Sequence, residues 1–184
     1  MKETGLMFKA PLVRAILEGR KTQTRRIVKP QPAPDKRFQG WILDSTDRKR
    51  IGKASWGRGT GGLVSDIECI GSPCGKPGDR IYVRETFAPY ERDCFYRADS
   101  GSTAMGPWKP AIHMPKDLAR IWLEVTGVRV ERLQEITPDN CIAEGAWPVE
   151  QRELGRGHEA VSAFRELWES TGGDWDANPW VWVI

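Results

Sequence analysis

The chain has 184 residues, of which 39% are hydrophobic and nine are Trp. This length and composition suffice for one well-buried domain, are too short for two, and exclude wholesale disorder. No stretch approaches the ~20 apolar residues of a membrane-spanning helix, and the N-terminus lacks the apolar segment of a signal peptide. We therefore expect a single cytoplasmic domain over residues 1–184 with no membrane partner.

The net charge of +3 is unevenly distributed. Residues 1–60 carry 15 Lys or Arg against 5 Asp or Glu, a balance of +10, whereas residues 61–184 carry 13 against 20, a balance of −7. A basic N-terminal third suits contacts with phosphate groups. The modest total excludes a protein that coats nucleic acid through charge alone.

A short strand is predicted at residues 6–8, and a short helix follows it directly. Pro11 falls in the first turn of this helix, and Gly19 falls where a left-handed C-terminal cap belongs. The apolar stripe of the helix consists of Leu12, Val13, Ile16 and Leu17. Residues 27 and 28 then predict a second short strand.

Between these two elements, residues 19–26 contain two hydroxyls, four cations and no apolar side chain. Lys21 stands beside Thr22 and Thr24 in this run. A Lys in such a place can shuttle protons for a hydroxyl nucleophile, because burial and neighbouring cations lower a Lys pKa toward neutrality. The alternative for the run is a solvated basic loop.

Residues 29–75 are rich in Pro, Gly and charge, and their hydrophobic groups keep no period over a whole element. We expect a loop insertion at about residues 29–75, either functional or disordered. Its basic cluster at residues 48–50 lies between Trp41 and Trp56, which predicts either RNA contacts by charge and stacking or a solvated loop. The glycines at residues 57–62 lack the Lys-Ser or Lys-Thr of a P-loop.

The next strand is predicted at residues 80–87, and Glu85 falls on its apolar face. A carboxylate there needs a cationic or hydrogen-bonding partner, so Glu85 belongs either to a buried structural pair or to the site. Another strand is predicted at residues 94–97. Over residues 121–130 the apolar alternation changes parity around Gly127, which predicts a β-bulge or bend of the kind found at barrel corners.

Thr137 is predicted to cap a helix that ends at Gly145. Glu144 lies in the last turn, where the helix dipole disfavours a carboxylate. A carboxylate in such a place usually has a partner, for which Lys21 is the candidate, although the position taken alone favours a surface Glu.

A packing helix is predicted at residues 158–170, followed by a strand at residues 180–184. Both faces of this strand are apolar. It is either a core strand or a base-stacking wall that uses Trp180 or Trp182.

Cysteines occur at positions 69, 74, 94 and 141 and are expected to be reduced thiols. The spacing of the first two is looser than that of a Cys-x2-Cys zinc site, and no second close pair exists. We predict neither a metal nor a cofactor.

Short strands at uneven intervals with three modest helices predict an α+β protein built on a small β-barrel. The pattern Gly-x-Lys-Thr-x-Thr-x-Arg at residues 19–26 resembles the signature of the ASCH domain, a PUA-like family associated with RNA. Later segments resemble the rest of an ASCH protein of the longer kind found in phages and prophages, at residues 77–80, 82–85, 137–145 and 180–183. The resemblance implies a PUA-like mixed β-barrel with flanking short helices and long loop insertions.

Some small members of this family are N4-acetylcytidine amidohydrolases that use a Lys, a Thr and a Glu. By the motif, the resemblance assigns these catalytic roles to Lys21, Thr24 and Glu144. Thr24 would attack the acyl carbonyl, Lys21 would transfer its proton to the leaving N4 amine, and Glu144 would orient the Lys. The residues predicted to bind substrate are Thr22, Arg26, Glu85, Trp180 and Trp182.

The expected partner is a modified nucleoside or RNA. Additional loops near residues 29–75, 88–118 and 146–157 distinguish this chain from the small amidohydrolases and leave its substrate open. The alternatives are a non-catalytic RNA-binding module and a metal-independent ribonuclease. The amidohydrolase reaction requires a turn between Gly19 and Thr22, because a regular strand would place Lys21 and Thr24 on opposite faces.

Overall fold

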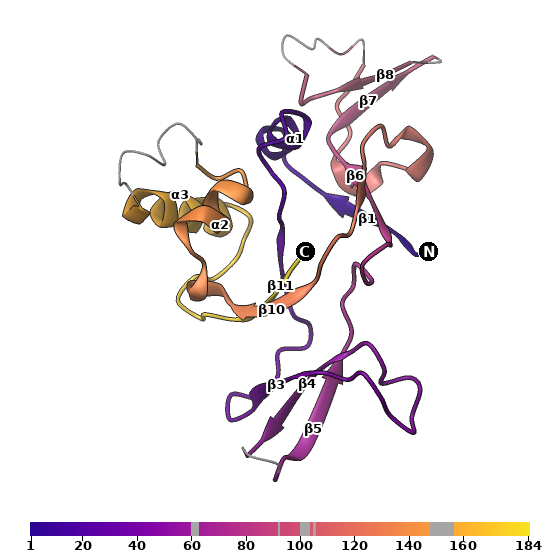
Figure 1. Cartoon of the computed structure of the whole chain (residues 1–184). Helices are drawn as coiled ribbons and strands as arrows, with labels where there is room; N and C mark the ends of the chain where they lie inside the picture. Colours follow the sequence, from indigo (N-terminus) through magenta and orange to yellow (C-terminus); the bar gives the residue numbers. More distant parts are fainter. Residues whose placement is uncertain (60–62, 92, 100–103, 105, 148–156) are drawn as a thin grey trace.

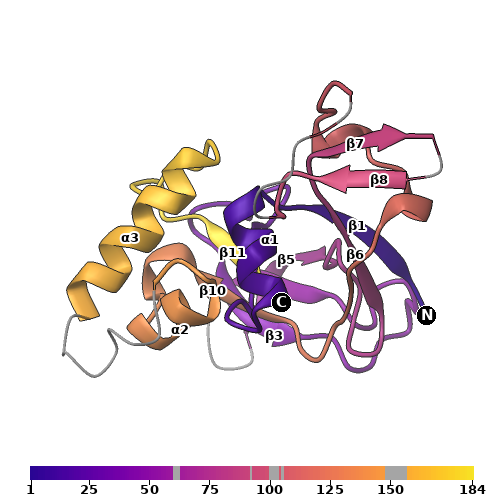
Figure 2. The same ribbon diagram turned by 90° about the horizontal axis from the view of Figure 1, so that it is seen from above.

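The computed structural model describes residues 1–59, 63–91, 93–99, 104, 106–147 and 157–184. Within these residues the chain forms eleven strands in four small sheets and three α-helices (Figure 1), which confirms the predicted α+β class. Seen from above, α3 lies at one end of the molecule and the β7–β8 hairpin at the other, with α1 between them (Figure 2).

Sheet 1 consists of β1 (Glu3–Met7), β6 (Arg80–Arg84) and β9 (Trp122–Glu124), in the order β1-β6-β9. β1 runs parallel to β6, and β9 runs antiparallel to it. Helix α1 (Ala10–Leu17) packs against this sheet, because Val13 lies in one buried cluster with Phe8 and Val83. The positive φ of 72° at Gly19 confirms the predicted end of the helix.

Sheet 2 consists of β10 (Arg129–Arg132), β11 (Trp180–Val183) and β2 (Arg25–Ile27), with β11 in the middle and antiparallel to both neighbours. Helices α2 (Pro138–Ala143) and α3 (Gly157–Ser170) share a buried cluster with this sheet, in which Val181 and Val183 meet Phe164. Thr137 accepts a hydrogen bond from the amide of Asn140 at 3.3 Å, which confirms the predicted cap of α2.

Sheet 3 consists of β3 (Arg37–Trp41), β4 (Ala54–Arg58) and β5 (Ser65–Ile70), all antiparallel. The prediction of a loop without regular structure is therefore wrong for the three segments that form these strands, at residues 37–41, 54–58 and 65–70. Two register shifts conceal the strand period, one next to Gly40 and one next to Arg58. Residues 54–57 are also buried on both faces, so β4 shows no polar alternation.

Sheet 3 docks on sheet 2 through aromatic side chains. Trp56 of β4 is fully buried, with its ring centroid 6.2 Å from that of Trp182 and 6.0 Å from that of Trp180. These edge-to-face contacts join two segments that are distant in the sequence.

The fourth sheet is a hairpin of β7 (Phe87–Tyr90) and β8 (Asp93–Tyr96), which occupies part of the loop expected at residues 88–118. Three single turns of 3-10 helix complete the fold: η1 (Ala111–His113), η2 (Lys116–Leu118) and η3 (Leu133–Glu135). The third loop expected from the sequence, at residues 146–157, lies mostly outside the described residues.

The expected closed barrel does not form among the described strands, which divide into the four sheets above. The bulge predicted at Gly127 is also wrong, because the chain crosses there from β9 in sheet 1 to β10 in sheet 2. Val125 is buried with Ile81, whereas Val130 packs in the cluster of Trp182. The change of parity therefore reflects a change of sheet.

None of the helices in the described ranges combines the length and apolar character needed to cross a membrane. The four cysteines form no disulfide, and Cys74 and Cys141 are buried.

Candidate active site

The chain turns sharply after α1, as the amidohydrolase hypothesis requires. The two amides that follow Gly19 both donate to the carbonyl oxygen of Ala15, at 2.8 and 2.9 Å. The next two amides both donate to the carbonyl oxygen of Ala143, at 2.8 and 2.9 Å. Strand β2 begins only at Arg25, so Lys21 lies in a loop held between the ends of α1 and α2.

Lys21 and Glu144 form a buried ion pair. The Nζ of Lys21 lies 2.8 Å from Oε2 of Glu144, and it also donates to the carbonyl oxygens of Glu144 at 2.9 Å and Gln23 at 2.6 Å. The exposed fractions are 8% for Lys21 and 4% for Glu144. The prediction that Glu144 has Lys21 as its partner is confirmed.

Burial lowers the pKa of Lys21 below its ordinary value of 10.5, and the charges of Arg26 and Arg25 act in the same direction. The carboxylate of Glu144 opposes this shift because it favours the charged ammonium. The downward direction of the pKa is the one that a proton shuttle needs.

Arg25 belongs to the same site, although the sequence analysis did not select it. Its Nη1 donates to Oε1 of Glu144 at 3.1 Å, and its Nη2 donates to Oε2 of Glu131 at 2.8 Å. Both carboxylate oxygens of Glu144 are therefore occupied by cations, one by Lys21 and one by Arg25. Arg25 shares a strand face with Ile27, so its place on an apolar face is the signal that could have revealed it.

A second layer of contacts fixes Glu131. Arg129 pairs with Glu131, and its Nη2 also lies 3.2 Å from the side-chain oxygens of Gln23 and Asn140. These bonds connect β10, the loop before β2 and helix α2, which are the three segments around the ion pair.

The backbone of Thr24 is hydrogen-bonded, whereas its hydroxyl has no hydrogen-bond partner among the described residues. Its amide donates to the carbonyl oxygen of Ile184 at 2.9 Å, and the amide of Ile184 donates back to Thr24 at 3.0 Å. Within the part of the chain that the structure describes, no hydrogen bond involves the Thr24 hydroxyl. The side chain lines the same cavity as Lys21 and Glu144.

This cavity, called the cationic cavity below, has a volume of about 690 Å³. Its walls come from the β1–α1 junction, strand β2 and the C-terminal half of α3. Its cations are Lys9, Lys21, Arg25, Arg26 and Lys29, and its one described carboxylate is Glu144. The volume is within the range of small-molecule sites.

Arg26 also lines the cationic cavity, as predicted for a substrate-binding residue. Its Nη2 donates to the carbonyl oxygen of Met7 at 2.9 Å, and its guanidinium carbon lies 5.2 Å from the ring centroid of Phe8. The same ring is 5.8 Å from Nζ of Lys21. Burial lowers the pKa of Arg26.

The other four residues predicted to bind substrate do not line the cationic cavity. Thr22 is exposed, and its backbone amide donates to the carbonyl oxygen of Ala143 at the end of α2. Trp182 is 1% exposed and packs in the core, and Trp180 contacts the guanidinium of Arg132 at 4.3 Å. Of the two possibilities for this strand, the burial of Trp182 therefore fits a core strand and not a base-stacking wall.

Glu85 is 1% exposed and forms a bidentate pair with Arg120, at 2.9 and 3.1 Å. Burial raises the pKa of Glu85, and Arg120 opposes the shift. Of the two possibilities left open for Glu85, the structure favours the buried structural pair.

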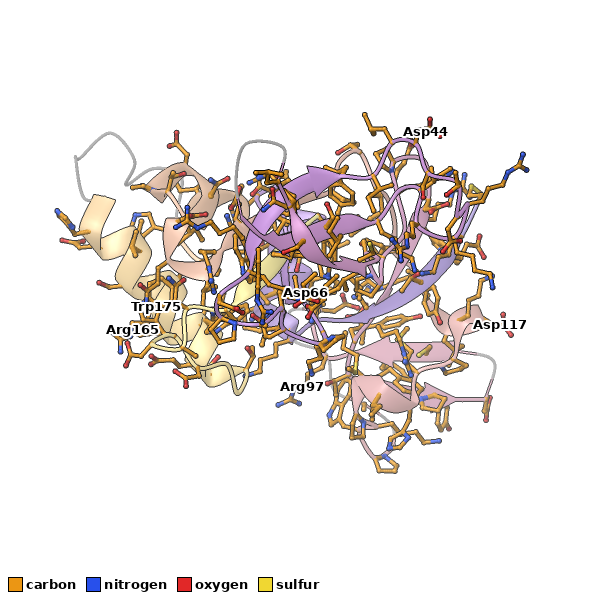
Figure 3. All side chains as sticks on the ribbon, turned by 90° about the horizontal axis from the view of Figure 1, so that it is seen from below. Asp44, Asp66, Arg97, Asp117, Arg165 and Trp175 are labelled. Carbon is orange, nitrogen blue, oxygen red and sulfur yellow. The ribbon has the colours of Figure 1, made fainter. Side chains whose placement is uncertain are left out.

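The basic cluster at residues 48–50 is exposed in the loop between β3 and β4, and Figure 3 places Asp44 of the same loop at the edge of the molecule. Its flanking aromatic residues are not available for stacking, because Trp56 is buried and Trp41 packs 5.9 Å from Trp182. No group of metal-ligating side chains occurs among the residues that the structure describes.

Comparisons with protein-family models, with curated proteins and with solved structures found no match.

Proposed function

We propose that this protein is a metal-independent amidohydrolase that removes the acyl group from N4-acetylcytidine or a related N-acylated cytidine. The observation that carries the proposal is the buried Lys21–Glu144 pair beside the free hydroxyl of Thr24 in one cavity. We also propose that residues 19–26 are an ASCH signature, that the fold is related to the PUA-like fold, and that the protein is cytoplasmic.

In the proposed reaction, the Oγ1 of Thr24 attacks the acyl carbonyl while neutral Lys21 accepts its proton. The bond between the carbonyl carbon and N4 then breaks, and Lys21 delivers the proton to the leaving amine. Water hydrolyses the acyl ester on Thr24 by the same proton route. Glu144 orients Lys21 and, through its negative charge, stabilises the protonated form between the two transfers.

Arg26 is the proposed stabiliser of the oxyanion, because it is a cation in the cavity wall two residues after Thr24. Removing one donor of this kind typically costs about 3 kcal/mol in the activation free energy. Thr22 has no such role in the proposal, since it does not line the cavity.

The test is incubation of the purified protein with N4-acetylcytidine, with release of cytidine followed by chromatography. We expect turnover in the wild type and its loss in Lys21→Ala, Glu144→Ala and Thr24→Val. Lys36→Ala is the matched control, because Lys36 is an equally buried Lys with carboxylate partners at 2.7 and 3.1 Å that does not line the cavity. An inactive wild type, or Thr24→Val that keeps full activity, would refute the proposed reaction.

A non-catalytic RNA-binding module is the second candidate, favoured by the five cations of the cavity. It predicts RNA binding that weakens with salt and is unchanged in Thr24→Val. A ribonuclease would instead degrade RNA, so RNA that stays intact during prolonged incubation excludes it.

A further inference from the structure

We infer that the cationic cavity binds its ligand through a phosphate group, so that the preferred substrate is a phosphorylated cytidine derivative, either a free nucleotide or a residue within a polynucleotide. For the reaction, the inference rests on the proposed function. The phosphate group is inferred separately, from the charges that line the cavity.

The charges that line the cavity do not balance. Lys21 and Arg25 are compensated by the carboxylate of Glu144, and Arg25 also by Glu131. The other three cations of the wall have no carboxylate within ion-pair distance among the described residues. They are Lys9, Arg26 and Lys29.

Arg26 is the central member of these three. It is half-buried, and the one hydrogen bond of its side chain to a described residue goes to the carbonyl oxygen of Met7. Removing a guanidinium partly from water without a counter-ion costs free energy. A phosphate that accepts two parallel hydrogen bonds from the guanidinium would offset this cost. The guanidinium lies over the ring of Phe8 and is also hydrogen-bonded to Met7, so little side-chain freedom would be lost on binding.

Lys9 and Lys29 lie at exposed positions of the same cavity wall. Lys9 donates to the carbonyl oxygen of Ser170 at 2.7 Å and thereby stays beside the end of α3. Lys29 makes no ion pair with a residue that the structure describes. Two exposed ammonium groups beside a guanidinium suit the several oxygens of a phosphate.

A neutral nucleoside would leave this positive potential uncompensated. It would use the ion pair of Lys21 and Glu144, the hydroxyl of Thr24 and, for the oxyanion, Arg26, but it would leave Lys9 and Lys29 without an anion. The chemistry of the cavity therefore distinguishes an anionic substrate from a neutral one, independently of which acyl group is removed.

The binding test uses calorimetry on the full chain at low ionic strength, with cytidine and with cytidine 5′-monophosphate. We expect the nucleotide to bind at least about tenfold more tightly, with a preference that declines as salt is added. Lys29→Gln should reduce the preference by a factor of about three, as expected for one exposed charge, and Arg26→Gln should remove most of it. Lys49→Gln is the matched control, because Lys49 is exposed in the loop between β3 and β4, away from the cavity, and the change in net charge is the same.

The turnover test compares N4-acetylcytidine, its 5′-monophosphate and a dinucleotide in which the same base carries a phosphodiester. A higher kcat/KM for the monophosphate alone assigns a free nucleotide, and a higher value for the dinucleotide assigns a polynucleotide. Equal affinity for cytidine and its monophosphate in the wild type would overturn the inference. Tighter binding of the monophosphate without any turnover would uphold the phosphate site and refute the amidohydrolase.

Discussion

The ammonium of Lys21 lies 2.8 Å from the carboxylate of Glu144, a residue 123 positions later in the chain, and both side chains are almost fully buried. The other oxygen of the same carboxylate receives Arg25 at 3.1 Å. Glu144 is thus the common anion of two buried cations, and the properties of the site depend on it.

Replacing Glu144 with Gln should strongly destabilise the protein. The substitution keeps the size of the side chain but leaves Lys21 and Arg25 with less compensation, and breaking a buried pair from one side costs about 3–5 kcal/mol. Denaturant unfolding would measure the change in the free energy of unfolding. Glu18→Gln, which removes an exposed carboxylate paired with Arg20, should change it by less than about 1 kcal/mol.

The activity should rise with pH on its acid side. The reaction needs neutral Lys21, whose fraction grows as the pH rises through its pKa, and burial places that pKa below 10.5. The rising limb of kcat/KM against pH should therefore lie below pH 10.5. Because the charge of Glu144 raises the pKa of Lys21, the residual activity of Glu144→Gln should show this limb at lower pH. A limb that stays in place would indicate a different titrating group.

Arg25→Lys should impair positioning even though it keeps the charge. An ammonium is a compact donor and cannot span the carboxylates of Glu144 and Glu131 as the guanidinium does. We expect kcat to fall by about tenfold, with KM nearly unchanged and the pH limb displaced, because Glu144 is less firmly held. A purely structural role would instead lower stability without moving the pH profile.

Gly145→Ala should disturb the site through backbone crowding. Gly145 has a φ of 73°, and a Cβ there would lie 3.0 Å from Cβ of Ala15 and 3.1 Å from Cβ of Lys21. Gly19 has nearly the same φ of 72° but open space around it, so Gly19→Ala carries only the conformational cost of roughly 1–2 kcal/mol. In thermal unfolding we expect Gly145→Ala to lose more stability than Gly19→Ala, and the difference measures the crowding against Lys21. Equal losses of stability in the two variants would show that the loop around Lys21 shifts to accommodate the added Cβ.

A double-mutant cycle on Glu85 and Arg120 should show that this pair is structural. Arg120→Ala leaves a carboxylate that is 1% exposed without its bidentate partner, at a cost of about 3 kcal/mol or more. Adding Glu85→Gln removes the unpaired charge and should recover part of that stability. The proposed activity should persist in the double variant, because Glu85 does not line the cationic cavity.

Local chemistry made part of the fold and site predictable. The proline and glycine that bound α1 and the threonine that caps α2 act on neighbouring residues, so their effects can be read from the sequence. For Glu144 the local signal was weaker: its unfavourable position at a helix end indicated a cationic partner, but the position alone favoured a surface Glu.

The parts that were missed depend on contacts between distant segments. Arg25 meets carboxylates 106 and 119 positions away, and only the pairing of β2 with β11 brings them together. Sheet 3 was missed because its register shifts and its doubly buried β4 erase the alternation by which strands are recognised. The barrel was predicted from the ASCH resemblance, from short strands at uneven intervals and from the parity change at Gly127. One sheet with a bulge and two separate sheets explain that parity change equally well.

The pairing of β2 with β11 also has a consequence for synthesis on the ribosome. Strand β2 carries Arg25 and Arg26, and among the described strands it bonds to β11 alone. Since β2 ends at Ile27 and β11 at Val183, the segment next to the candidate nucleophile finds its sheet only after all the residues between these strands have been translated, a delay on the order of 10 s. During that interval the cations of β2 have no sheet to hold them in place, so ligands of the finished cavity have nothing to bind until β11 has been translated.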